Sequence, residues 1–348
     1  MLNKIRRSIR FVFIIPTLIF FLTATSCSRQ GDKIYKDTRI LMATAVSITV
    51  VSPTEQKAKE AIDAGFNEIK RIDDLLNLFS DKSDISLINS NAGLRPVKVS
   101  KDTIEVIEDA IEISRLTGGA FDPTVGPVKV LWNFDSKVIP PGAEIKKALP
   151  LVGYKNIEVK KDSNEVFLKK KGMMIDLGAI AKGFAADKAV QVIKAMGIKA
   201  GIVAASGDIR AFGLRPDGKL WHIGIRNPRG GRKDALATLY LSNGAISTSG
   251  DYEQFFILNG RRYCHIFDPK TGYSPTDTIS ASVIAPDGYK TDSLATGLFV
   301  LGHKKGIRLL EKLGLDGMII GSDHKIYLTK TLRGKIEIKG DNQFNNGG

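Results

Sequence analysis

The chain has 348 residues, which is long enough for a sizeable hydrophobic core and one or two domains. Hydrophobic residues make up 43% of it and charged residues 25%, a composition that excludes a disordered chain. The net charge of +14 favours anionic partners such as lipid headgroups or pyrophosphates, and the lack of a nucleic-acid-binding motif argues against nucleic acid.

Residues 1–26 have the layout of a secretory signal, with a basic segment, the apolar run "FVFIIPTLIFFL" and small residues before Cys27. The apolar run is too short to span a bilayer comfortably. Because "ATSC" resembles a bacterial lipobox, we expect a lipid on Cys27, with a plain signal peptide as the alternative. The lipid would anchor the chain to a bacterial membrane in the cell envelope, with residues 27–38 as a polar tether and the following domain outside the cytoplasm. Cys264, the other cysteine, is expected to be a small buried apolar group.

The first half of the chain is mainly helical in pattern. Apolar spacing predicts a strand over 39–52, helices over 54–79 and 100–119 that begin at the N-caps Thr54 and Ser100, and a short helix over 83–93. Further on, "MMIDLGAIAKGFAADKAV" predicts a short strand at 173–175, a turn at Gly178 and a helix over 179–196. Such a junction points backbone N–H groups at the space beyond the strand, which attracts phosphate, although most such junctions bind nothing.

The second half is richer in strands. Six of them are predicted between residues 201 and 285, followed by helices over 291–302 and 304–314 and strands over 316–322 and 325–332. Since helices come early and strands cluster in mid-chain, the pattern predicts an α+β fold rather than a regular βαβ alternation. We expect one catalytic unit with an embedded subdomain over 39–330 and a polar tail over 331–348.

One candidate metal site lies in "TDSLATGLFVLG". Thr291 is expected to be the N-cap of this helix, which places Asp292 in the first turn and Thr296 four residues later on the same face. A carboxylate and a hydroxyl are oxygen ligands that suit Mg²⁺. The alternative is purely structural, because an aspartate near a helix N-terminus also favours the helix dipole.

Other stretches carry candidate catalytic or binding groups. In "YCHIFDPKTGYSP", His265 follows a strand and Asp268 lies at its exit, so that His265 is either a proton acceptor near neutral pH or a structural histidine. In "GGAFDPTVGP", glycines surround Phe121, which could face a flat ring. "AASGDIRAFG" and "STSGDYEQFF" each put Ser-Gly-Asp at a strand end, where they line a cleft or form only tight turns. Signature motifs of common hydrolases, kinases and Rossmann proteins are missing.

Taken together and in this order, six motifs resemble the ApbE family of FAD:protein FMN transferases: "GAFDPTVGPVKVLW", "IDLGAIAKGFAADKA", "SGDIRAFG", "ISTSGDY", "HIFDPKTG" and "APDGYKTDSLATGLFVLG". The resemblance extends from Arg39 to Leu328. It implies an α+β fold related to the T-fold, and family members are often exported lipoproteins. It also implies that FAD is bound and cut with Mg²⁺, and that FMN passes to a threonine or serine hydroxyl of a partner protein. Family partners include redox subunits of Na⁺-pumping quinone reductase (Nqr) and Rnf complexes.

The resemblance further implies roles for individual residues. Mg²⁺ would be held by the carbonyl of Ala179 and the side chains of Asp292 and Thr296, and Mn²⁺ is an alternative because it also prefers oxygen ligands. The FAD site would be lined by Met42, Phe79, Ala120, Phe121, Asp122, Asp176, Lys182 and Ile266. His265 would assist deprotonation of the acceptor hydroxyl, with Asp268 or Asp251 as support.

The chain departs from the family pattern at three places. "MAT" at Met42 stands where Met-Gly-Thr is usual, "AASGD" stands for the more usual Asn-x-Gly-Gly-Asp, and Phe79 stands where tyrosine is frequent. Phe79 can stack on a flat ring but cannot donate a hydrogen bond. That neighbourhood is thought to influence whether FAD is transferred or only hydrolysed, so a Mg²⁺-dependent FAD pyrophosphatase that releases FMN and AMP is an alternative function. A second alternative, a non-catalytic flavin-binding lipoprotein, is opposed by the retention of Asp292, Thr296 and His265.

Overall fold

The structure, a computed structural model, describes residues 31–231, 234–339 and 344–346. The predicted signal segment over 1–26 and the lipidation candidate Cys27 lie outside the described residues. Within the described ranges, no helix combines the length and the hydropathy that crossing a bilayer requires.

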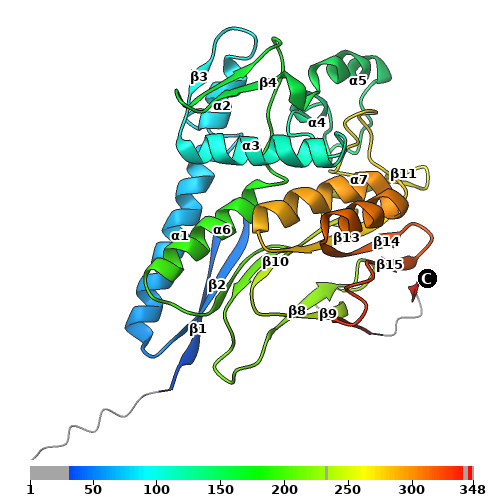
Figure 1. Ribbon diagram of the computed structural model, residues 1–348. Coiled ribbons are helices and arrows are strands. Elements are labelled where there is room, and N and C mark those ends of the chain that lie inside the picture. The colour runs from blue at the N-terminus through cyan, green and yellow to red at the C-terminus, as the bar shows by residue number, and fades with distance from the viewer. Residues whose placement is uncertain (1–30, 232–233, 340–343, 347–348) are drawn as a thin grey trace, which may run out of the picture. The chain divides into compact units, whose positions relative to one another are not determined.

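Helices and strands follow one another without a regular alternation (Figure 1). The helices are α1 (Glu55–Leu76), α2 (Asp84–Ser90), α3 (Lys101–Leu116), α4 (Gly126–Lys129), α5 (Gly142–Ala148), α6 (Ala181–Ala195) and α7 (Gly288–Leu313), with short 3₁₀ turns η1 (Leu149–Leu151) and η2 (Tyr154–Asn156). The strands are β1 (Lys33–Leu41), β2 (Thr44–Ser52), β3 (Val97–Lys98), β4 (Ile157–Lys160), β5 (Glu165–Leu168), β6 (Gly201–Ala205), β7 (Asp208–Phe212), β8 (Trp221–Arg226), β9 (Ala235–Leu241), β10 (Gly244–Gly250), β11 (Phe255–Leu258), β12 (Arg261–Cys264), β13 (Thr278–Ala285), β14 (Asp316–Gly321), β15 (Lys325–Leu328), β16 (Ile336–Ile338) and β17 (Asn345–Asn346).

A nine-stranded sheet in the order β1-β2-β6-β7-β10-β13-β14-β15-β17 organises the described chain. Neighbouring strands in it are antiparallel, except that β15 and β17 are parallel. Smaller sheets have the orders β16-β9-β8 and β3-β5-β4, and β11 pairs with β12 as a separate hairpin. The predicted α+β class is therefore confirmed.

Both faces of the large sheet are buried. On β14, Ile319 packs with the core beneath α1, α3, α6 and α7, whereas Met318 and Ile320 pack with the core beneath β8 and β9. Successive side chains of a strand point to opposite faces, so this alternation is what a strand between two apolar layers requires. The cavity described below lies where the two layers approach each other.

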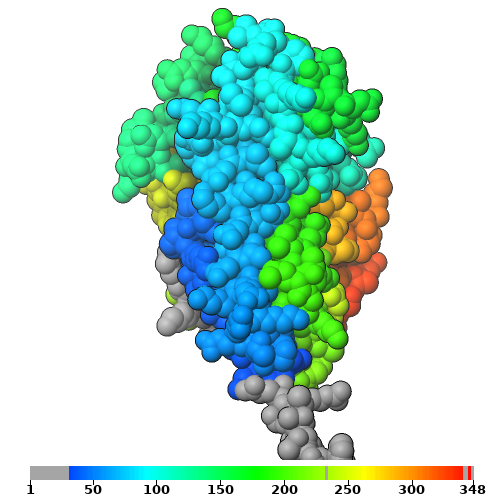
Figure 2. All heavy atoms as spheres, turned by 90° about the vertical axis from the view of Figure 1, so that its left-hand side faces the viewer, coloured from blue at the N-terminus to red at the C-terminus, as the bar shows by residue number. Residues whose placement is uncertain are grey.

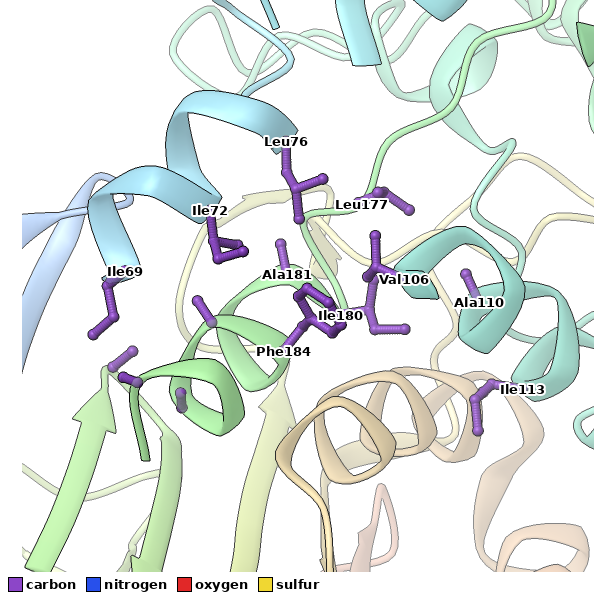
Figure 3. Close-up of a cluster of buried hydrophobic side chains, with 14 of the residues drawn as sticks. Ile69, Ile72, Leu76, Val106, Ala110, Ile113, Leu177, Ile180, Ala181 and Phe184 are labelled. Atoms are coloured by element: carbon purple, nitrogen blue, oxygen red, sulfur yellow. The ribbon is translucent and has the colours of Figure 1, made fainter. Parts of the chain in front are cut away.

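The helices on the first face begin and end where local signals place them. The Thr54 hydroxyl accepts a hydrogen bond from the Lys57 N–H at the start of α1, and the Ser100 hydroxyl accepts one from the Thr103 N–H at the start of α3, as predicted. Figure 3 shows apolar side chains of α1, α3 and α6 converging in one cluster, and Figure 2 shows α1 and α6 side by side on the outer surface. Burial of a large side chain such as Phe66 stabilises this layer by about 2–3 kcal/mol.

The edges of the predicted domain differ from the structure. The predicted strand over 39–52 is two strands, β1 and β2, because Met42 and Ala43 turn the chain with φ of 51° and 56°. β1 begins at Lys33, inside the range predicted as a tether, because its pairing with β2 orders it. Within the predicted tail, β16 pairs with β9 and β17 pairs with β15. Long-range pairing, which local sequence does not encode, extends the fold in both directions.

The strand predicted at 173–175 does not form. The side-chain amide of Asn89 donates to the Ile175 carbonyl at 2.9 Å and accepts from the Ile175 N–H at 2.7 Å, so a side chain takes the place of a strand partner. The two helices predicted over 291–302 and 304–314 are the two halves of α7, which is kinked at Gly302 with φ of 75°. The first half carries Asp292 and Thr296, which line the cavity described below.

Candidate functional site

A cavity of about 800 Å³ opens between the helical layer and the three-stranded sheet β16-β9-β8, of which β8 lines it. Its volume lies in the range of small-molecule sites. Ten of the residues singled out from the sequence line it: Ala120, Phe121, Asp122, Asp176, Ala179, Lys182, His265, Ile266, Asp292 and Thr296. Residues from widely separated parts of the chain are thus brought to one place.

Asp176 forms the turn that leads into α6. Its carboxylate accepts a hydrogen bond from the Gly178 N–H at 2.8 Å and forms an ion pair with Lys129, which also lines the cavity. The Asp176 N–H donates to the Pro123 carbonyl at 2.7 Å, which joins this turn to the Phe121–Asp122 segment. The two motifs that contain these residues therefore form one wall.

α6 has no side-chain cap of its own, and Asp292 of α7 supplies a substitute. The Asp292 carboxylate accepts a hydrogen bond from the Gly183 N–H at 3.1 Å, in the first turn of α6. The two helices can approach this closely because Gly183 and Gly288 face each other without side chains. Asp292 is consequently held at the N-terminus of a neighbouring helix, where the dipole favours its negative charge.

Lys182 lies between two carboxylates in the cavity. Its Nζ is 3.1 Å from Asp208 Oδ2, 3.6 Å from Asp292 Oδ2, and 3.3 Å from the Gly178 carbonyl oxygen to which it donates. Burial and the nearby Asp208 raise the pKa of the Asp292 carboxyl to about 7. For Lys182, burial lowers the pKa but the two aspartates outweigh it, so that the pKa is raised and the ammonium keeps its charge.

Thr296 lies one turn after Asp292 on the same face of α7. Its hydroxyl is 3.1 Å from the Ser249 hydroxyl of β10. The expectation that Thr291 caps this helix is wrong, because α7 already begins at Gly288 and the Thr291 hydroxyl instead donates to the Gly288 carbonyl. The Asp187 side chain accepts the Tyr289 N–H at 3.0 Å, so a tertiary contact supplies an acceptor for that turn.

The oxygen atoms around Lys182 fit a hard divalent cation. The Asp292 carboxylate, the Thr296 hydroxyl and the backbone at Ala179 all line the cavity, and the contact of one ammonium with both Asp292 and the Gly178 carbonyl shows that these oxygens attract positive charge. Among the described residues, no group of three or more His, Cys, Asp or Glu side chains could hold a metal ion. A cation here would depend on carbonyl, hydroxyl and substrate phosphate oxygens, as is usual for Mg²⁺.

His265 directly follows β12 and lines the same cavity. Its backbone N–H donates to the Gln254 carbonyl at 3.1 Å, and its buried Nδ1 atom has no hydrogen-bond partner among the described residues. Burial, together with the positive charges of Lys129 and Lys182, lowers the pKa of His265 to about 4. The imidazole is therefore neutral at physiological pH and able to accept a proton.

The two acids expected to support His265 do not contact it. The Asp251 carboxylate accepts two hydrogen bonds from the Arg229 guanidinium, at 2.6 and 2.7 Å. The Asp268 carboxylate accepts the Lys270 N–H at 2.9 Å and closes the turn after the strand. Both carboxylates have other partners and no hydrogen bond to His265 among the described residues, so their expected role beside His265 stays a prediction.

Two residues expected in the FAD site do not line the cavity. Phe79 is 92% exposed in the turn after α1. Met42 lies in the β1–β2 turn, where its N–H donates to Asp73 at 3.2 Å, although Thr44 and Ala45 just after it do line the cavity. The position of a turn relative to a distant cavity was not available from its local sequence.

Several residues of the site were missed. Asp208, which pairs with Lys182, and Ser249, which contacts Thr296, belong to the two Ser-Gly-Asp stretches that the sequence marked only as possible cleft residues. Tyr252 also lines the cavity, and burial raises its pKa to about 12. The sequence signal for Asp208 was its position directly after Ser-Gly at a strand end.

The chain is similar to a group of known proteins. Residues 42–319 match the ApbE family. An FAD:protein FMN transferase of Treponema pallidum is 32% identical over 333 residues, covering 90% of this chain and 92% of the relative, and one of Haemophilus influenzae is 32% identical, covering 81% and 83%. The crystal structure of the ApbE protein of Thermotoga maritima is 34% identical with a TM-score of 0.81, covering 87% of this chain and 99% of that one.

Proposed function

The chain belongs to the ApbE family, and we propose that it transfers FMN from FAD to a hydroxyl group of an acceptor protein. The observation that carries the proposal is the placement of a neutral histidine, His265, in the same cavity as the Lys182, Asp208 and Asp292 group. This combination provides a proton acceptor and a cation-attracting group facing one space. Phosphoryl transfer needs both, because the hydroxyl must lose its proton while negative charge on the pyrophosphate is neutralised.

The proposed reaction exchanges one phosphorus–oxygen bond for another. The hydroxyl oxygen of a threonine or serine forms a bond to the phosphorus of the FMN half of FAD. The bond from this phosphorus to the bridging oxygen breaks, and that oxygen leaves with AMP. The hydroxyl proton goes to the neutral imidazole of His265, which keeps the balance of atoms and charge.

We propose that Asp292, Thr296 and the carbonyl of Ala179 hold Mg²⁺. The ion would supply Lewis-acid neutralisation of the pyrophosphate charge. Ser249 orients the Thr296 hydroxyl, and the Gly183 N–H orients the Asp292 carboxylate. Both proposed side-chain ligands are therefore oriented by a second residue of this chain.

For FAD itself, we propose that Ala120, Phe121, Asp122, Asp176, Lys182 and Ile266 form the walls of the binding site. Asp122 is rigid, because its carboxylate accepts hydrogen bonds from the Thr124 N–H at 2.9 Å and the Tyr154 N–H at 2.9 Å. Lys129 and Lys182 bring positive charge to the cavity. Their contribution is electrostatic attraction of a phosphorylated ligand in a partly water-excluded site.

The acceptor and the location are further parts of the proposal. We propose a redox protein subunit of the Nqr or Rnf type as the acceptor, since the family resemblance implies it. We also propose that a lipid on Cys27 anchors the chain to a bacterial membrane, with the compact unit from Asp32 onward outside the cytoplasm. Both parts rest on the sequence.

The test combines intact-mass spectrometry with in-gel flavin fluorescence. The protein is incubated with FAD, Mg²⁺ and an acceptor domain that carries a candidate threonine, in parallel with the variant Asp292→Asn and the matched control Asp323→Asn. Asp323 is an exposed acid of the β14–β15 turn that does not line the cavity. We expect the acceptor to gain the mass of FMN with the parent and the control, but not with Asp292→Asn.

Two other results would change the assignment. Release of free FMN and AMP with every tested acceptor unmodified would favour the FAD pyrophosphatase. Binding of FAD without any product would favour a flavin-binding protein. Equal activity of Asp292→Asn and the parent would contradict the proposed role of the cavity.

A further inference from the structure

The β11–β12 hairpin connects directly to the cavity at both of its ends. Tyr252 and Glu253, which line the cavity, lie just before β11, and His265 comes immediately after β12. The inner side of the hairpin is fixed, because Phe256 and Tyr263 are buried in an aromatic cluster with Trp132. The hairpin lies at the right-hand side of Figure 1, below α5.

The backbone register shows that one edge of this hairpin is free. The His265 N–H donates to the Gln254 carbonyl, so these two residues form a hydrogen-bonded pair of the ladder. In an antiparallel ladder hydrogen-bonded and non-hydrogen-bonded pairs alternate. Phe255 and Ile257 are therefore in non-hydrogen-bonded pairs with β12. Their N–H and C=O groups therefore point away from β12. Across the described residues, β11 has β12 as its sole strand neighbour.

The opposite edge of the hairpin is protected. The Ser274 hydroxyl accepts the Cys264 N–H at 3.0 Å and donates to the Cys264 carbonyl at 2.6 Å, so a side chain covers the outward groups of β12. Natural proteins commonly blunt exposed strand edges in such ways. The edge of β11 has no comparable protection, which points to a function for it.

The outer face of β11 is apolar and has arginines beside it. Phe255 is 39% exposed and Ile257 is 56% exposed, and the Arg262 guanidinium lies 3.9 Å from the centre of the Phe255 ring. Arg262 forms an ion pair with Asp251, and Arg226 in the adjoining cavity forms one with Glu253. Arg261 is exposed on β12 and has no ion-pair partner among the described residues, so it carries the uncompensated positive charge. An apolar strand edge with arginines beside it fits an extended acidic polypeptide, through backbone pairing and opposite charge.

We propose that the acceptor protein docks by adding an extended acidic segment to the free edge of β11. Such a segment pairs with the backbone of Phe255 and Ile257, and a hydroxyl further along it enters the cavity beside His265. This inference rests on the proposed transfer reaction and names the surface that selects its protein substrate. The flavin itself is bound elsewhere, by the walls of the cavity.

Two variants at Ile257 test the docking. Ile257→Pro removes the outward N–H without taking a hydrogen bond from the β11–β12 ladder, and Ile257→Glu places negative charge on the proposed surface. The matched control is Ile34→Glu, a partly exposed isoleucine on β1, the edge strand of the large sheet. The probe is a short synthetic peptide with one threonine flanked by valine and aspartate, together with a twin that has lysine in place of aspartate.

Transfer kinetics and FAD affinity are measured separately, and circular dichroism checks folding. We expect both Ile257 variants to raise KM for the acidic peptide about tenfold or more, with kcat and the Kd for FAD unchanged. Ile34→Glu is expected to match the parent, and the lysine twin to be a poor substrate for every variant.

Four results would overturn the docking proposal. The first is a parental KM for the acidic peptide in folded Ile257→Pro and Ile257→Glu. The second is weaker FAD binding in these variants, because the hairpin would then support the flavin site. The third is equal use of both peptides.

The fourth is a parent protein that binds FAD and modifies a folded acceptor domain but modifies neither peptide. Docking through an extended segment is then wrong, while the transferase function stands. Failure of transfer to all acceptors would remove the proposed function itself.

Discussion

The contact between α6 and α7 sets up a sharp test with the substitution Gly183→Ala. A Cβ atom at Gly183 would lie 2.1 Å from the carbonyl oxygen of Gly288 and 2.4 Å from its carbonyl carbon, whereas ordinary contacts are 3.4 to 4 Å. Both atoms belong to the backbone, so no flexible side chain can move aside. The helices must separate by roughly 1 Å, which removes the hydrogen bond from the Gly183 N–H to Asp292.

The expected cost follows from three contributions. Overpacking costs about 1–3 kcal/mol or somewhat more, and the lost hydrogen bond to a charged group costs about 1.5–3 kcal/mol. The better helix propensity of alanine returns about 1 kcal/mol. We therefore expect Gly183→Ala to lower the free energy of unfolding by about 2–4 kcal/mol, and to weaken metal-dependent FAD binding because Asp292 is displaced.

The assay is urea denaturation followed by circular dichroism, with FAD titration by fluorescence. Gly65→Ala in α1 is the matched control, because the nearest atoms to a Cβ there belong to side chains: the terminal methyl groups of Ile193 and Ile48 at 2.8 Å and Cγ1 of Ile193 at 3.2 Å. These side chains can rotate, so we expect a change within about 1 kcal/mol. Equal stability and equal FAD affinity of the two variants would refute the close-contact argument.

Further substitutions test single residues. Burial and the neighbouring Glu105 and Glu112 raise the pKa of Asp109 to about 7. The carboxyl therefore holds its proton more tightly in the folded than in the unfolded chain. Its contribution to stability is present at low pH and is lost as the pH rises from about 4 to 7. Asp109→Asn should thus unfold at higher urea than the parent at pH 8, by on the order of 1–2 kcal/mol after allowance for solvent screening, with no gain at pH 4. Ala43 has a φ of 56°, a backbone conformation that costs an L-residue about 1 kcal/mol. Ala43→Gly should therefore raise the melting temperature. An unchanged or lower melting temperature would contradict backbone strain at Ala43. His265→Gln should lower kcat for transfer at least about a hundredfold with little change in FAD affinity, and a pH–rate profile of the parent without a break near pH 6.5 would match the lowered pKa.

Sequence reasoning succeeded where the signal is local. The caps Thr54 and Ser100 act within one helical turn, and the apolar stripe of α1 is contained in its own sequence. It failed where a distant group supplies the partner: Asn89 replaces a strand partner at Ile175, and Asp187 supplies the acceptor that lets α7 begin before Thr291. Local propensity cannot show such contacts, because they form only when the chain folds.

The candidate site shows the same division. Asp292 and Thr296 could be paired from helical spacing alone, because four residues make one turn. Asp208 could not be joined to Lys182, since they lie on different elements and meet only across the finished sheet. The family resemblance implied Asp251 and Asp268 as support for His265, and in the structure arginine and turn backbone are the hydrogen-bond partners of these acids.

The contact of Lys182 with Asp208 and Asp292 also bears on synthesis. These residues lie on α6, β7 and α7, so the group is complete only when all three elements are present. A nascent chain that has not yet been extended past Gly288 lacks both Asp292 and Thr296. The proposed metal-binding side chains are thus among the last parts of the site to be synthesised, and a chain truncated before Gly288 is expected to have no metal-dependent activity.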